Sequence, residues 1–172
     1  MTEHGAWLDQ SQSDLAASIR VLDRSDGTTY CHAIAKAQQA VEKSIKGLMT
    51  VLRHNEIVSV TVGWKHDVER FMTILVRLAG VRNRGEIGAM IANAFDQETR
   101  GDIRAIDRLV PKRPPPGSLP SRNTEYPYQA HGVWHAPSES DSFTWEEVRR
   151  FQALAHHVVG RCRQIASVVE KH

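Results

Sequence analysis

Between Thr29 and Arg53, apolar residues recur at steps of three and four, which is the spacing of one face of a helix. The pattern therefore predicts a long helix with one buried face. Beside that face runs a second stripe of small residues, which lets a neighbouring backbone approach closely, so we expect this helix at the centre of a bundle. The apolar stripe consists of Ile34, Ala37, Val41, Ile45, Leu48 and Leu52, and the small stripe of Ala33, Ala37, Ala40, Ser44 and Gly47.

The charged residues of the same stretch indicate its solvent side. Lys36, Lys43 and Lys46 fall away from the apolar stripe. Glu42 precedes Lys46 by about one turn, at the spacing that lets two side chains on a helix pair. We expect a solvated face that carries an ion pair between Glu42 and Lys46.

Apolar periodicity predicts further helices on either side of the central one. Thr99 and Asp102 resemble a capping box that opens a short helix through Val110, and Thr144 with Glu147 is a clearer capping box for the last helix. The fourth and fifth helices alternatively form one bent rod, since Gly101 is the one internal breaker. The other predicted helices cover residues 5–23, 67–79, 86–95 and 144–170.

Two stretches between the helices have their own character. Three valines alternate with polar residues between 54 and 65, which predicts an extended connector, with pairing to a second copy of the chain as the alternative. All seven prolines lie in 111–137, so residues 111–143 are expected to form a long Pro-rich loop that is either functional or disordered.

These elements predict an all-α protein, an antiparallel up-and-down bundle of four to five long helices. A chain of 172 residues with 41% hydrophobic content suits a single domain over 1–172. The net charge of +2 permits contact with nucleic acid without requiring it. The two cysteines fall in predicted helices, where we expect buried thiols in a reducing compartment.

Several classes of protein are not indicated. The N-terminal residues lack the apolar core of a signal peptide, and no run approaches the ~18 apolar residues that span a bilayer, so we predict a cytoplasmic protein without membrane contact. His131 and His135 have no carboxylate or cysteine set beside them, and we expect no metal and no cofactor. The chain has no Walker loop, dinucleotide glycine fingerprint, serine-nucleophile motif or Cys–His dyad.

AQQAVEKSIK, at 37–46 in the central helix, is the most specific of a series of short motifs that run through most of the chain. With these motifs the chain resembles the HEPN domain family. The resemblance implies a bundle of four or five helices, commonly dimeric. It further implies that the domain binds nucleotides or nucleic acid, cleaves RNA without a metal, or partners a small nucleotidyltransferase. The other motifs are Trp7-Leu8, Asp14 to Ala17, Tyr30, His66 to Val68, Arg122 and Tyr126-Pro127.

Family members that cleave RNA are expected to carry an arginine, four to six residues and then a histidine at a dimer interface. Between 77 and 113, no histidine follows an arginine, and the spacing occurs in the last helix: Arg149 or Arg150 with His156, and Arg150 with His157. Arg149 and His156 share a helix face with backbones roughly 10.5 Å apart. They predict either a basic strip for a phosphate backbone, with histidine as general acid or base, or an ordinary solvated face.

Six further residues are candidate ligand-binding residues, each with a structural alternative. Gln38 lies within the wide apolar face of the central helix, where it either contacts a ligand or ties two helices together. His66 begins a helix and either lines a pocket or caps the helix. Arg122 and Tyr126 either contact single-stranded RNA by charge and stacking or belong to a solubilising loop. The remaining two candidates are Glu42 and Lys46.

The leading interpretation is a non-catalytic HEPN-like module that forms a homodimer and binds a nucleotide, RNA or a partner protein such as a small nucleotidyltransferase. One alternative is a metal-independent ribonuclease that uses an Arg/His pair of the last helix across a dimer. The other is a purely structural subunit.

Overall fold

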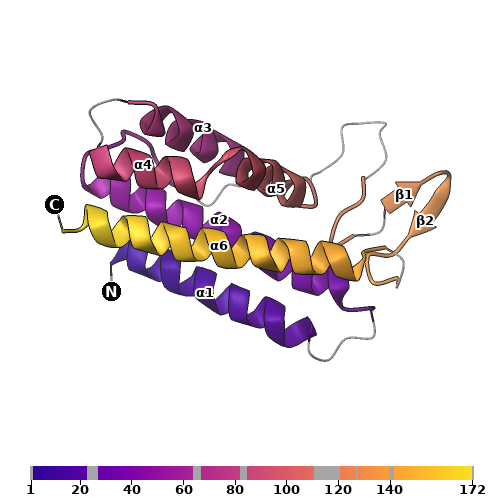
Figure 1. Cartoon of the computed structure of the whole chain (residues 1–172). Helices are drawn as coiled ribbons and strands as arrows, with labels where there is room; N and C mark the ends of the chain where they lie inside the picture. The colour runs from indigo at the N-terminus through magenta and orange to yellow at the C-terminus, as the bar shows by residue number, and fades with distance from the viewer. Residues whose placement is uncertain are drawn as a thin grey trace.

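The mostly helical fold predicted from the apolar pattern is confirmed, but instead of four to five long helices the described residues form three helices of 20–25 residues and three of 10–12. The computed structural model describes residues 2–22, 27–63, 67–81, 85–110, 121–126, 128–139 and 142–171. Within these residues the chain forms six α-helices and one two-stranded sheet (Figure 1). The elements are α1 (Glu3–Leu22), α2 (Tyr30–His54), α3 (Val68–Ala79), α4 (Gly85–Ala94), α5 (Gln97–Asp107), β1 (Tyr128–Ala130), β2 (Val133–His135) and α6 (Trp145–Val169).

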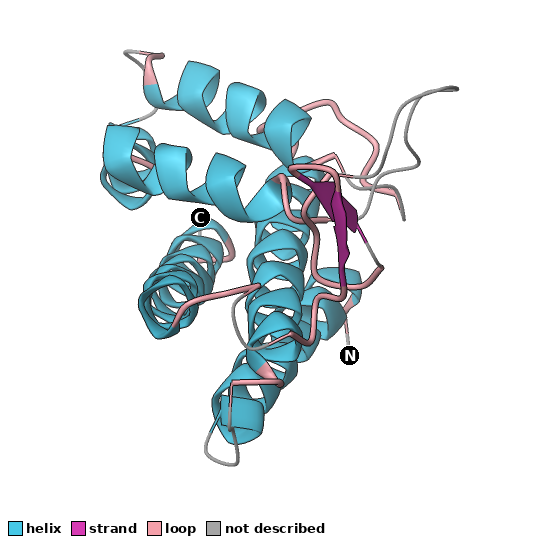
Figure 2. Ribbon diagram, turned by 90° about the vertical axis from the view of Figure 1, so that its right-hand side faces the viewer, coloured by secondary structure: helices cyan, strands magenta, loops and turns pink. Residues whose placement is uncertain are grey.

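The three long helices α1, α2 and α6 lie side by side (Figures 1 and 2). Near the end of α1, the Ser18 hydroxyl donates a hydrogen bond to the carbonyl of Ala33 at the start of α2 (2.8 Å). The Gln152 amide at the start of α6 donates to the Ser18 carbonyl (3.0 Å). At the other end of the bundle, Arg53 of α2 pairs with Glu3 of α1 (2.9 Å). α1 is therefore antiparallel to α2 and α6, and the latter two run in the same direction.

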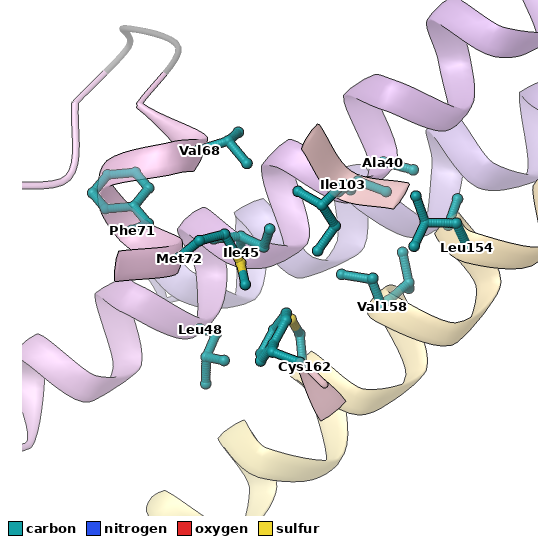
Figure 3. Packing of buried hydrophobic residues seen from close by; sticks show 14 of the residues in the cluster. Ala40, Ile45, Leu48, Val68, Phe71, Met72, Ile103, Leu154, Val158 and Cys162 are labelled. Atoms are coloured by element: carbon teal, nitrogen blue, oxygen red, sulfur yellow. The ribbon is translucent and has the colours of Figure 1, made fainter. Parts of the chain in front are cut away.

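α2 is the central helix, as its two stripes predict. Ala33 and Ala40 of the small stripe and Ile45 and Leu48 of the apolar stripe are completely buried. In Figure 3, Ile45 and Leu48 lie among side chains from α3, α5 and α6, including Met72, Ile103 and Cys162. At Gly47 the small stripe meets α1, because an added Cβ atom there would lie only 2.8 Å from Cγ of Leu8. Gly47 thus sets the distance between α1 and α2 at this point.

The shorter helices α3, α4 and α5 form a second layer over α2 and α6 (Figure 2). Asp102 of α5 binds Arg150 near the start of α6, and the Ala94 carbonyl at the end of α4 lies 3.2 Å from Nε2 of His157, further along α6. α4 and α5 are therefore antiparallel to α6. The start of α3 lines the same groove as the end of α5, so α3 is antiparallel to α5 and has the direction of α2. The strict up-and-down order predicted from the sequence does not hold between α2 and α3.

The reason for this departure is the connector that follows α2. Residues 57–63 form no helix or strand in the part of the chain that the structure describes, and burial alternates from Ser59 to Val62, as expected for the predicted connector. Val60 and Val62 are buried in the core, and Val62 lines a cavity together with Lys43, so the connector runs back along α2. The chain thereby returns along the bundle before α3 begins.

The predicted capping box at Thr99 and Asp102 is wrong. α5 begins earlier, where the Asp96 carboxylate caps the helix by accepting a hydrogen bond from the Thr99 backbone N–H (2.8 Å). α4 and α5 are separated at Phe95 and Asp96, and Gly101 lies inside α5. The break between α4 and α5 therefore occurs at Asp96, a favourable N-cap residue, and not at Gly101.

The stretch before α6 contains more structure than the prolines predict. β1 and β2 pair antiparallel around a two-residue turn in which His131 and Gly132 have φ angles of 50° and 81°. Both are in the left-handed region, as a type I′ hairpin turn requires. The predicted capping box of Thr144 and Glu147 is confirmed. Residues 111–120 of the predicted loop lie outside the described residues.

Candidate functional site

The four catalytic candidates on α6 are not assembled into one site. Arg149 and His156 are both exposed. Arg150 instead donates from Nε to Oδ1 of Asp102 (3.0 Å), and Asp102 raises the pKa of this guanidinium. The His157 ring is half-buried against the end of α4. Two of the four candidates thus hold α6 against the second layer, and the other two face solvent.

Gln38, Glu42 and Lys46 form a linear array on α2. Nζ of Lys46 lies 2.7 Å from Oε1 of Glu42, which confirms the predicted ion pair. The Gln38 amide donates to the other carboxylate oxygen of Glu42 (3.4 Å). The array is buried, with Lys46 only 2% exposed and its Nζ 5.2 Å from the centre of the Trp7 ring.

The prediction that Lys46 lies on a solvated face is therefore wrong. The sequence places this residue away from the apolar stripe, but α1 covers it from one side through Trp7. The extended connector packs into the core through Val60 and Val62 after turning back along α2. A buried ion pair of this kind holds its two partners strongly once formed, because removing either one leaves an uncompensated charge.

A second buried carboxylate, Asp14 of α1, was not identified from the sequence as a site residue. It receives hydrogen bonds from Lys36 (3.1 Å) and Lys43 of α2. Burial by itself raises the pKa of Asp14, but the hydrogen bonds and charges of Lys43 and Lys36 outweigh it and hold this pKa below its ordinary value of 3.8. Asp14 and its two lysine partners therefore join α1 to α2.

Arg122 has a structural role. Its guanidinium binds both carboxylate oxygens of Glu147 (2.9 and 2.8 Å), donates from Nε to the Ser142 carbonyl (2.8 Å), and lies 4.2 Å from the centre of the Phe143 ring. The hydrogen bonds that Arg122 donates to Glu147 raise the pKa of Arg122, and the same contact lowers the pKa of Glu147. Arg122 therefore anchors the segment before α6.

The last two ligand-binding candidates are separate from these clusters. Tyr126 is 60% exposed beside the hairpin. His66 lies outside the described residues. The structure thus brings Gln38, Glu42 and Lys46 together, but it does not place Arg122 or Tyr126 with them.

A groove between α3 and α5 is the strongest candidate site, and sequence analysis missed it. It has a volume of about 450 Å³ and an apolar floor formed by Met72, Val76 and Ile103. Ile103 is fully buried, whereas Val76 is 36% exposed. An apolar floor open to solvent is the usual basis of a small-molecule site.

Three arginines border this groove. Arg77 comes from α3, and Arg100 and Arg104 come from successive turns of α5. Arg100 donates from Nε to the Asp96 carbonyl (3.1 Å), while Arg77 and Arg104 are exposed and form no ion pair within the described residues. Guanidinium groups bind phosphate and carboxylate through paired hydrogen bonds.

The two ends of the groove differ: one end is acidic, and the other continues into a smaller cavity. Glu69 and Asp107 line the end where α3 begins and α5 finishes. At the opposite end a smaller cavity of about 150 Å³ shares Val76 and Arg100 with the groove and reaches Phe95. The sequence shows Arg100 and Arg104 one turn apart, but nothing in it indicates that α3 packs antiparallel to α5.

The arrangement defines an α-helical bundle with an arginine-bordered groove on its second layer. The described residues include no cluster of three or more metal-ligating side chains and no helix that is long and apolar enough to cross a membrane. Comparison of the chain with protein-family models, with curated proteins and with solved structures finds no significant match in any of the three.

Proposed function

We propose that the protein is a non-catalytic, HEPN-like binding module whose ligand is a nucleotide or a short stretch of RNA held in the groove between α3 and α5. The observation that carries this proposal is the combination of three arginines with an apolar floor in one groove of about 450 Å³. The resemblance of the α2 segment to HEPN domains supports the same class of ligand.

The three arginines of the groove outnumber its two carboxylates, Glu69 and Asp107, so its charge favours an anion over a neutral ligand. Arg77 and Arg104 have no ion-pair partner among the described residues, so their charge is available to a ligand. The floor residues Met72, Val76 and Ile103 offer apolar contact to a base or a sugar ring. A phosphate placed between the guanidinium groups would accept their hydrogen bonds, because the planar guanidinium group of arginine matches the geometry of phosphate.

Titration calorimetry with adenosine diphosphate and with a uridine hexanucleotide tests this proposal on the intact chain. A hydrogen bond to a charged group contributes about 1.5–3 kcal/mol, and about 1.4 kcal/mol corresponds to a factor of ten in affinity. The double variant Arg77→Gln/Arg104→Gln is therefore expected to bind at least about tenfold more weakly than the wild type. Binding should also weaken as salt is raised.

The matched control is Arg20→Gln/Arg161→Gln, which removes the same charge from exposed positions on α1 and α6. It is expected to bind like the wild type. If neither ligand binds at millimolar concentration, or if both double variants bind equally well, the groove is not the site of a nucleotide or RNA.

The partners and the alternative functions predicted from the sequence can each be tested. A homodimer and a small nucleotidyltransferase partner are expected from the resemblance, and light scattering of the purified chain tests the first of them. Ribonuclease activity remains an alternative prediction. It requires that labelled RNA be cleaved in the presence of a chelator and that His156→Ala or His157→Ala abolish the cleavage. A chain that binds neither RNA nor nucleotide and does not cleave RNA fits the remaining alternative, a structural subunit.

A further inference from the structure

A second cavity opens where α1, α2 and the connector meet, away from the groove between α3 and α5. Its volume is about 600 Å³. One face of α1 lines it through Ala6, Trp7 and Gln10, and the connector lines it through Val62 and Gly63. This size lies within the range of about 300–1,000 Å³ that is typical of small-molecule sites.

The wall formed by Trp7 is held in place from within the protein. Gly47 of α2 lets α1 approach so closely that an added Cβ would lie 3.3 Å from Cβ of Trp7. The buried ammonium of Lys46 lies 5.2 Å from the centre of the indole ring. A cavity whose wall is fixed before binding loses little conformational freedom when a ligand enters.

The charged residues that line the cavity within the described part of the chain are already neutralised. Lys43 is paired with the buried carboxylate of Asp14, and Glu3 is paired with Arg53 (2.9 Å). The exposed side-chain amide of Gln10 adds an uncharged polar group. An ion that entered would give up its hydration without meeting an unpaired counter-charge among these lining residues, so they select against charged ligands.

We propose that this cavity binds an uncharged, planar aromatic molecule. The molecule packs between Trp7 and the connector at Val62, and its polar atom forms a hydrogen bond with the amide of Gln10. A planar aromatic ligand gains both burial of its apolar surface and ring–ring contact with the indole side chain of Trp7. The site is independent of the arginine-bordered groove, which takes an anion.

Ligand-detected NMR with indole as the probe tests the proposal, with indole-3-acetate as its charged counterpart. A Cβ atom at Gly63 meets no atom within 4 Å, so Gly63→Leu can fill the cavity without a clash. This variant is expected to raise the dissociation constant of indole at least about tenfold, and Ala6→Leu is expected to act in the same direction. Indole-3-acetate is expected to bind more weakly than indole.

Gly160→Leu is the matched control, since Gly160 on α6 also has no neighbouring atom within 4 Å of an added Cβ. It should leave the affinity for indole unchanged, as should Arg77→Gln/Arg104→Gln. Thermal melting identifies a variant that fails to fold, in which case Ala6→Leu decides. The proposal is overturned if indole does not bind at millimolar concentration. It is also overturned if indole-3-acetate binds more tightly than indole. The same holds if folded Gly63→Leu or folded Ala6→Leu binds indole as tightly as Gly160→Leu does.

Discussion

Replacing Gly47 by alanine tests the closest contact in the bundle. The added Cβ would lie 2.8 Å from Cγ and 2.9 Å from Cδ2 of Leu8, and 3.3 Å from Cβ of Trp7. Two of these distances are shorter than atoms of folded proteins tolerate, and Cγ of Leu8 and Cβ of Trp7 are not free ends of flexible side chains. α1 must therefore shift away from α2, or Leu8 must leave its rotamer.

Two effects of opposite sign decide the outcome. Alanine favours the helical state over glycine by about 0.8–1.0 kcal/mol. Overpacking of a close contact costs typically about 1–3 kcal/mol. Gly160→Ala in α6 receives only the first contribution, because its Cβ meets no atom within 4 Å. The free energies of unfolding of the two variants should thus differ by the overpacking cost alone.

Urea denaturation of the wild type and both variants in one buffer measures this difference. Gly160→Ala is expected to be more stable than the wild type by about 0.8–1.0 kcal/mol, and Gly47→Ala to be less stable than Gly160→Ala by about 1–3 kcal/mol. Gly101→Ala in α5, whose Cβ also meets open space, is a second control. If Gly47→Ala is as stable as Gly160→Ala, α1 does not pack against α2 at this distance, and the account of the small stripe is wrong.

Three further predictions concern the buried polar and apolar residues of the bundle. Glu42→Ala is expected to destabilise the protein by about 3–5 kcal/mol, whereas Glu42→Leu/Lys46→Met should lose much less, because it leaves no buried charge; urea denaturation compares them. The pKa of Asp14 is lowered in the folded state, so its carboxylate stabilises the fold above its ordinary pKa of 3.8, and this stabilisation is lost as the pH falls through the lower folded value. Thermal melting of Asp14→Asn should therefore show a deficit at pH 7 that narrows in acid. Ile45→Asp should cost roughly 3 kcal/mol or more, and a variant that melts like the wild type would contradict the burial of this face.

Much of the fold could be predicted from the apolar periodicity because the helices are amphipathic. Ile34, Ile45 and Leu48 are buried on the predicted face of α2, and Thr144 begins α6 through the predicted capping box. Cys162 is buried as expected, and burial raises the pKa of its thiol to about 12. These features depend on residues a few positions apart, which the sequence displays directly.

Features that depend on distant segments could not be predicted in this way. Lys46 is polar in a helical pattern that assigns it to solvent, but it is buried, and Trp7 of α1 lies against its ammonium group. The hairpin before α6 had a local signal, since His131-Gly132 separates two short runs that contain β-forming residues, but the surrounding prolines argued for irregular structure. Arg77 and Arg104 line one groove because α3 packs against α5, and no spacing in the sequence encodes that packing.

The positions of the polar residues indicate which helices stabilise the bundle and which are available to bind a ligand. Among the long helices, the charged side chains with least exposure are bound to one another: Lys46 with Glu42 within α2, and Lys43 of α2 with Asp14 of α1. The pair of Lys43 and Asp14 holds α1 and α2 together, and neither pair leaves its charge free for a ligand. In the second layer, by contrast, Arg77 has no ion-pair partner among the described residues and borders a groove between helices of only 12 and 11 residues. Short helices with exposed backbone open more readily than long buried ones, and binding regions are commonly drawn from such segments. The long helices therefore provide a rigid base, and ligand binding in the groove is expected to order α3 and α5 more than α1 and α2.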